Sequence, residues 1–182
     1  MKSIIKEVNE KSDNVIKENN SLINAFQSRL STRLVHIFEK HKITINNKVI
    51  TKKIEENLVN NLIDINFEII SKYRYMLKKY EEIIQDSISK KCEISEIKTS
   101  TMSFIKKIAA KNNEMLNISV INNFMDDINS MVLLYDNNKL NEDVQKRIKI
   151  DTNDIISEIN KHNYNYVIES LNMIIKNIIA NV

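Results

Sequence analysis

The chain has 182 residues and a formal net charge of +3, and it contains neither glycine nor proline. At ordinary usage a chain of this length carries roughly a dozen glycines and nearly as many prolines. Their absence excludes phosphate-binding loops and the serine elbow of hydrolases as these are usually built, and most β-rich folds, whose turns need such residues. Asn, Ser, Thr and Asp can close helix ends instead, so the composition predicts an all-α protein.

Two long helices are predicted in the first half of the chain. Apolar residues recur every three or four positions from about residue 3 to 41 and again from about 50 to 90. Each helix is on the order of 55 Å long, and their short connection favours an antiparallel hairpin. Ser12 and Asn19 interrupt the first stripe, where they either fix the register between helices or lie at a wet edge.

The connection between these helices, KITINNKVITKK (residues 42–53), departs from the helical pattern. Ile43, Ile45 and Val49 alternate with polar residues, which is typical of a small β-hairpin. An isolated hairpin is marginal in water, and Asn46-Asn47 lacks the glycine that such a turn prefers. We therefore expect an extended connector in which Asn46 or Asn47 begins the second helix.

Tyrosines and lysines alternate in SKYRYMLKKY (residues 71–80), a composition that also suggests nucleic-acid binding. On a helix, however, Tyr73, Met76 and Tyr80 share one stripe with the apolar residues around them. The spacing predicts that they belong to the core. Arg74 and Lys78 then lie on the solvated face, paired with Glu81 or Glu82.

Three or four shorter helices are predicted after Cys92. One runs from about 95 to 112, another from about 119 to 136, and a third run starts near Asp151 and has a candidate break at NKHNYN (residues 160–165), which has low helix propensity. The apolar segment at 166–182 has a single lysine and is expected to be a buried bundle helix or to dock into another chain. Residues 1–182 are expected to form one elongated bundle, with a subdivision into a hairpin (1–92) and a C-terminal bundle (93–182) as the variant.

Composition also bears on localisation. The hydrophobic fraction of 42% and the charged fraction of 28% indicate a folded, water-soluble chain. No stretch is long and apolar enough to span a membrane, and the charged N-terminus lacks the apolar core of a signal peptide. The single Cys92 cannot form an internal disulfide. We expect a cytoplasmic or virus-internal protein from an AT-rich genome, since Ile, Asn and Lys dominate.

No catalytic, cofactor or metal site is predicted. His36 and His41 are five residues apart, whereas zinc-protease motifs place histidines at i and i+4. Residues 136–143 begin like a calcium loop, but the pattern fails at Leu140 and at Arg147, where a bidentate glutamate is needed. Cys92 has no base nearby in the sequence. These absences predict a protein that is not an enzyme.

Charge is distributed unevenly along the chain. Residues 29–53 have a net charge of +6, and residues 112–158 have a net charge of −5. The hairpin would gather the cations at its tip, where they would attract phosphate or an acidic protein surface. The candidate contact residues are Arg29, Arg33, Lys40, Lys42, Lys48, Lys52 and Lys53.

These features favour a non-enzymatic helical interaction protein, such as a scaffold, an adaptor, an inhibitor or an assembly component of a virus or mobile element. The long helices have wider apolar stripes than one neighbour covers, so a protein partner or a homo-oligomer, most simply a dimer, is expected. One alternative is sequence-independent nucleic-acid binding through the basic tip. A second alternative is a membrane-active helical protein.

Overall fold

The computed structural model describes residues 2–40, 42–115, 120–136 and 141–181. Described residues that have regular structure are all helical, and none of them forms a strand, so the prediction of an all-α fold is confirmed. The helices are α1 (Ile5–Lys40), α2 (Asn47–Ile54), the π-helical segment η1 (Glu55–Val59), α3 (Asn60–Ser89), α4 (Ile94–Met115), α5 (Asn122–Asp136) and α6 (Glu142–Ala180).

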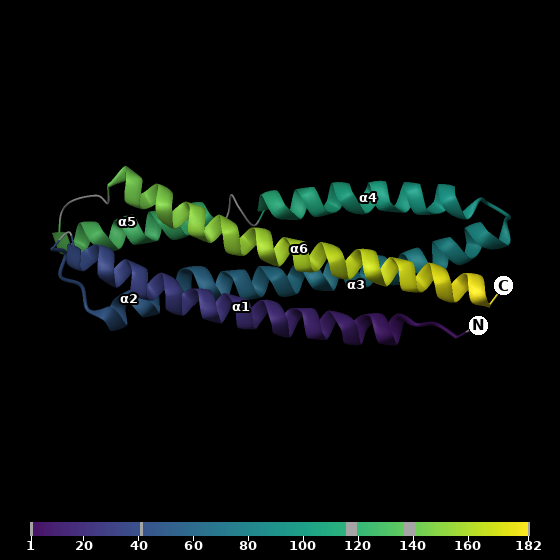
Figure 1. The fold of residues 1–182 in the computed structure, drawn as a ribbon, viewed down its shortest axis with the longest axis horizontal. Coiled ribbons are helices and arrows are strands. Elements are labelled where there is room, and N and C mark those ends of the chain that lie inside the picture. The colour runs from purple at the N-terminus through teal and green to yellow at the C-terminus, as the bar shows by residue number, and fades with distance from the viewer. Residues whose placement is uncertain (1, 41, 116–119, 137–140, 182) are drawn as a thin grey trace.

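The helices lie side by side in an elongated bundle of antiparallel rows (Figure 1). The first row is α1, and the second is α2, η1 and α3, which follow one another without a break. The third row consists of α4 followed by α5, and the last is α6. α1, α3 and α6 pack against one another along the bundle, while α4 packs on α3 and α6 and α5 packs on η1 and α2. Both chain ends therefore lie at one end of the bundle, and the α1–α2 connection lies at the other.

The predicted N-terminal hairpin is present, and its connector is extended rather than a β-wing. The side-chain oxygen of Asn46 accepts a hydrogen bond from the backbone N–H of Lys48 at 2.9 Å and so caps α2. The N–H of Ile43 donates to the carbonyl of Phe38 at 2.8 Å. Ile43 and Ile45 are buried, so the alternation seen in the sequence places these two side chains in the core.

In the C-terminal half, α6 is longer than predicted from the sequence and is continuous where a break was predicted. α6 starts after Asn141, whose side chain accepts from the N–H of Asp143, and not near Asp151. It continues through residues 160–165, so the predicted break there is wrong. With 39 residues α6 exceeds the 36 residues of α1, so the expectation of only shorter C-terminal helices is also wrong. His41, the predicted helix start at 119 and residues 137–140 of the calcium-like loop lie outside the described residues.

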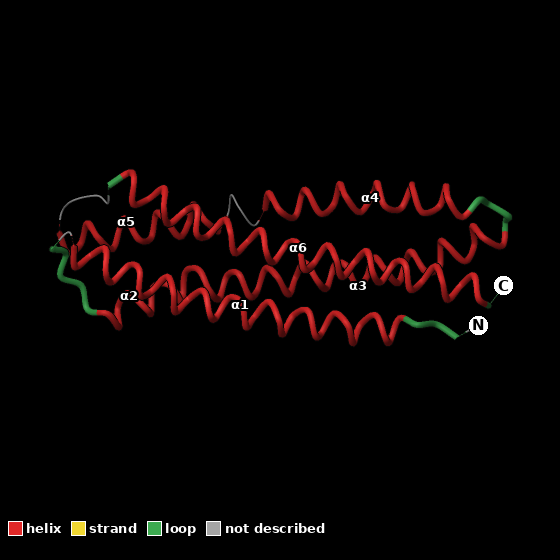
Figure 2. The backbone as a smooth tube through the Cα atoms, viewed as in Figure 1, coloured by secondary structure: helices red, strands yellow, loops and turns green. Residues whose placement is uncertain are grey.

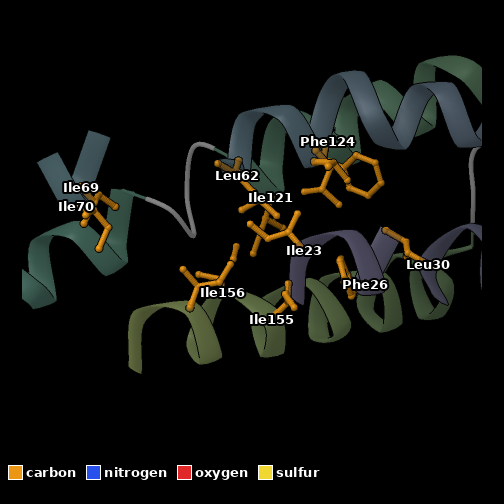
Figure 3. Packing of buried hydrophobic residues seen from close by; sticks show 14 of the residues in the cluster. Ile23, Phe26, Leu30, Leu62, Ile69, Ile70, Ile121, Phe124, Ile155 and Ile156 are labelled. Atoms are coloured by element: carbon orange, nitrogen blue, oxygen red, sulfur yellow. The ribbon is translucent and has the colours of Figure 1, made fainter. Parts of the chain in front are cut away.

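The helices share one cluster of buried apolar side chains. Figure 3 shows Ile23 and Phe26 of α1 facing Ile155 and Ile156 of α6, with Phe124 of α5 close by. Side chains that widen the stripes of the two hairpin helices, among them Ile23, Phe38, Ile70 and Ile84, are buried within this single chain. The wide stripes therefore no longer argue for a dimer, and the oligomeric state stays a prediction.

A layer of three asparagines crosses the core between α1, α3 and α6. Asn19 donates to Oδ1 of Asn163 at 2.9 Å and to Oδ1 of Asn66 at 3.4 Å. Asn163 also donates to Oδ1 of Asn66 at 2.8 Å. All three side chains are buried, so Asn19 does not lie at a wet edge, and the layer can fix the register of three helices. The amide of Asn163 explains why residues 160–165 stay helical: tertiary hydrogen bonds override their weak helix propensity.

A second polar contact joins α1 to α3. Arg74 donates to the hydroxyl of Ser12 and forms an ion pair with Asp13. The predicted pairing of Arg74 with Glu81 or Glu82 is therefore wrong, and the buried carboxylate of Glu81 accepts instead from Ser3 at 2.8 and 3.0 Å. Tyr73 is buried, as predicted, while Met76 and Tyr80 are half-buried against the core.

Candidate interaction groove

The candidate cations lie at the connector end of the bundle. Arg29, Arg33 and Lys40 belong to α1, Lys42 to the connector, and Lys48, Lys52 and Lys53 to α2. The hydroxyls of Ser31 and Thr51 are 2.9 Å apart and joined by a hydrogen bond, which sets these parts of α1 and α2 at the same level. The hairpin thus brings these residues together at one end, as the sequence suggested.

Part of the acidic segment (residues 112–158) lies at the same end, because α5 ends and α6 begins there (Figure 1). Arg33 of α1 forms an ion pair with Asp151 of α6. Lys52 is 3.8 Å from Glu56 in the next turn of its own row. The contrast between basic and acidic segments along the sequence therefore does not produce a purely basic end. Of the segment's charged residues, the side chains of Glu114, Asp136 and Lys139 lie outside the described part.

A groove of about 400 Å³ runs between α1 and α6. Its floor is apolar and consists of the half-buried Leu22 with the buried Phe26, Leu30 and Ile155. Its charged residues are sorted by helix: α1 contributes Arg29 and Arg33, and α6 contributes Asp151, Asp154 and Glu158. One wall of the groove is therefore basic and the other acidic.

Polar contacts between α1 and α6 close both ends of this groove. At the connector end, Arg33 pairs with Asp151. At the other end, Nδ1 of His162 lies 2.9 Å from Oδ1 of Asn19, in the asparagine layer. The two contacts bracket the apolar floor.

The charges between these two contacts are left facing the groove. In the described part of the chain, Arg29 and Asp154 have no ion pair, and both are exposed. Glu158 lies 3.8 Å from Nε2 of His162, one turn further along α6. Arg29 thus remains available on the basic wall, and Asp154 and Glu158 remain available on the acidic wall.

The other candidate cations form a more dispersed surface. Lys48 and Lys52 of α2 line a shallow depression together with Glu55 and Glu56 of η1, so acidic residues are interspersed there too. Lys40 and Lys42 are exposed and Lys53 is half-buried. Their role in binding nucleic acid or an acidic protein stays a prediction.

Other chemistry is sparse in the described residues. They contain no cluster of three or more His, Cys, Asp or Glu side chains arranged to hold a metal ion. His36 is exposed on α1, and Cys92 is an exposed free thiol. Burial raises the pKa of the Tyr166 and Tyr73 hydroxyls, although hydrogen bonds from neighbouring side chains partly offset this. None of the described helices is long and apolar enough to cross a membrane.

Sequence reasoning identified the basic wall of the groove and missed the acidic one. Arg29 and Arg33 are four residues apart, and Asp151, Asp154 and Glu158 are three and four apart, so each set lies on one helical face. That spacing is visible in the sequence. The side-by-side pairing of α1 with α6 is not, because more than a hundred residues separate the two helices.

Comparison with known proteins gives no match: no family model, no curated protein and no solved structure matches this chain. Function is therefore inferred from the geometry of the groove.

Proposed function

We propose that this chain is a non-enzymatic helical interaction protein, such as a scaffold, adaptor, inhibitor or assembly component. It acts through protein–protein contacts made by the groove between α1 and α6. The observation that carries the proposal is the combination of an apolar floor with two walls of opposite charge, whose central charges have no ion-pair partner across the groove among the described residues.

This combination supports a protein partner because stable interfaces place apolar contacts at the centre and charged contacts at the rim. Leu22, Phe26 and Leu30 supply such a centre along one face of α1. Arg29 stands beside them, and arginine is enriched among residues that dominate binding energy. Complementary charges at the rim raise the association rate and select the partner.

The lining residues support a non-catalytic role. They comprise leucine, isoleucine, phenylalanine, arginine, aspartate and glutamate, and they include no serine, threonine, cysteine, histidine, tyrosine or lysine. A hydroxyl, thiol, imidazole or amine nucleophile is therefore missing from the groove lining, and its three carboxylates all belong to α6. The acidic wall also disfavours nucleic acid in the groove, because its carboxylates repel phosphate.

Site-specific photocrosslinking in the native host tests the proposal. A benzophenone amino acid replaces Leu22 on the groove floor, and the matched control carries it at Ser21, which is exposed and does not line the groove. We expect a discrete adduct with one polypeptide from position 22 and none from position 21. An adduct with nucleic acid, or no adduct from position 22, contradicts the proposal.

A further inference from the structure

We infer that the groove binds an amphipathic α-helix whose apolar ridge has acidic residues along one flank and basic residues along the other. This inference rests on the proposed function and names the partner chemistry. It follows from three observations. The groove is about three helical turns long, the described residues contain no strand edge that could pair with an extended peptide, and one wall of the groove is basic while the other is acidic.

The length of the groove suits about three turns of helix. From Leu22 to Arg33 α1 rises roughly 17 Å at 1.5 Å per residue, and one helical turn rises 5.4 Å. A helix lying between α1 and α6 would present apolar residues at i, i+3 or i+4, and i+7 to the floor. Leu22, the most exposed residue of the floor, would contact them over the buried Phe26, Leu30 and Ile155.

A helix fits this groove better than an extended peptide. An extended peptide gains affinity mainly by hydrogen bonding its backbone to the edge of a sheet, and the described residues contain no strand. In the groove its backbone N–H and C=O groups would face apolar side chains and stay unpaired. A helix satisfies these groups internally.

Charge defines the flanks of the partner. The flank beside α1 needs an Asp or Glu to meet Arg29. The flank beside α6 needs Lys or Arg residues four apart, because Asp154 and Glu158 are themselves four apart. Arg33 and Asp151 already neutralise each other and add no preference.

The charges also determine the direction of the bound helix. Turning a helix end for end in the groove exchanges its left and right flanks. A given order of acidic and basic flanks therefore matches the walls in one direction only. A second copy of this chain could bind in the same place, and the test must separate it from a helix of another protein.

Binding of designed peptides to the full chain tests the inference. Three helical peptides share one leucine ridge and differ in their flanks, which are Glu and Lys, Lys and Lys, or Glu and Glu. We expect the wild-type chain to prefer the Glu/Lys peptide in fluorescence anisotropy. The Arg29→Glu variant should prefer the Lys/Lys peptide by about tenfold, since an attractive exposed pair becomes a repulsive one.

Two further variants make the test specific. Asp154→Lys combined with Glu158→Lys should shift the preference to the Glu/Glu peptide. Lys17→Glu matches the charge change of Arg29→Glu, but Lys17 is exposed and does not line the groove, so its preference should equal that of wild type.

The possible results separate the two proposals. The helix inference is overturned if none of the three peptides binds. It is also overturned if Arg29→Glu and Lys17→Glu change the peptide preference equally. The proposed function is then tested by the photocrosslink from position 22 alone. Self-association that the Glu/Lys peptide displaces, and that Arg29→Glu abolishes, shows that a second copy is the occupant and also overturns the inference. If the peptides bind selectively but no photocrosslink forms, the proposed function is rejected and the helix inference stands.

Discussion

The side-chain amide of Asn19 in α1 donates to Oδ1 of Asn163 in α6 at 2.9 Å, across a sequence separation of 144 residues. Both side chains are buried, and both bond to Asn66 of α3. Because an amide in an apolar core loses its hydrogen bonds when a helix slides, this layer favours one register of α1 against α6. That register sets Leu22 and Arg29 opposite Asp154 and Glu158.

Replacing Asn163 with leucine should destabilise the chain by about 2–4 kcal/mol, because it removes the 2.9 and 2.8 Å hydrogen bonds of the buried layer and leaves the amides of Asn19 and Asn66 joined to each other at 3.4 Å. Urea unfolding monitored by circular dichroism measures this loss. A variant as stable as wild type contradicts the proposed role of the layer.

The combined replacement of Asn19, Asn66 and Asn163 by leucine is the matched control. Removing all partners together leaves no orphaned amide from this layer, so most of the stability lost in Asn163→Leu should return. The register should become less well defined, which spin-label distances between α1 and α6 would report as a broadened distribution. A sharp distance equal to wild type would show that apolar packing alone sets the register.

Arg74 should be sensitive even to a change that keeps its charge. It donates to Ser12 and pairs with Asp13, and its side chain is 27% exposed. Because lysine lacks the planar fork that reaches both partners, Arg74→Lys should cost about 1–2 kcal/mol, after allowance for solvent screening. Thermal unfolding of Arg74→Lys checks this. The control variant is Lys78→Ala, which changes an exposed position of the same helix. Equal melting temperatures for the two variants would contradict it.

The ion pair of Arg33 with Asp151 should contribute little to folding. Its side chains are 46% and 25% exposed, so solvent screens the attraction. A double-mutant cycle of Arg33→Ala and Asp151→Ala should give a coupling energy of about 0.5–1 kcal/mol, smaller at high salt. A coupling that is large and independent of salt would show that the pair is a main determinant of the α1–α6 contact.

Stability should fall as the pH rises above 10.0, the ordinary pKa of tyrosine. Burial raises the pKa of Tyr73 and Tyr166, so the folded chain holds these protons at a pH where the unfolded chain has lost them. Below that pH both states are protonated and the effect vanishes. Urea unfolding at stepped pH should therefore show a shallower loss for Tyr73→Phe than for wild type. An unchanged slope would contradict the assignment.

The hairpin could be predicted from the sequence because it depends on local information. The three- and four-residue spacing of apolar side chains specifies both helices, and the connector between them is short. Asn46 as the start of α2 follows from its capping chemistry. The alternation at Ile43 and Ile45 was ambiguous, since burial of a connector and a β-strand produce the same pattern.

The rest depends on contacts between distant segments. Residues 160–165 have weak helix propensity, and only the hydrogen bonds of Asn163 to α1 and α3 show why α6 continues through them. The acidic wall was visible in the sequence as one charged face. Its place beside Arg29 depends on the packing of α6 along α1, which no local pattern specifies.

The most direct measurement of the central claim is a nuclear magnetic resonance titration of the isotope-labelled chain with the Glu/Lys helical peptide. We predict that the chemical-shift changes concentrate at residues 22–33 of α1 and 151–158 of α6, the two walls of the groove. Shifts centred on α2 or on the outer face of α3, or no shifts at all, would contradict it.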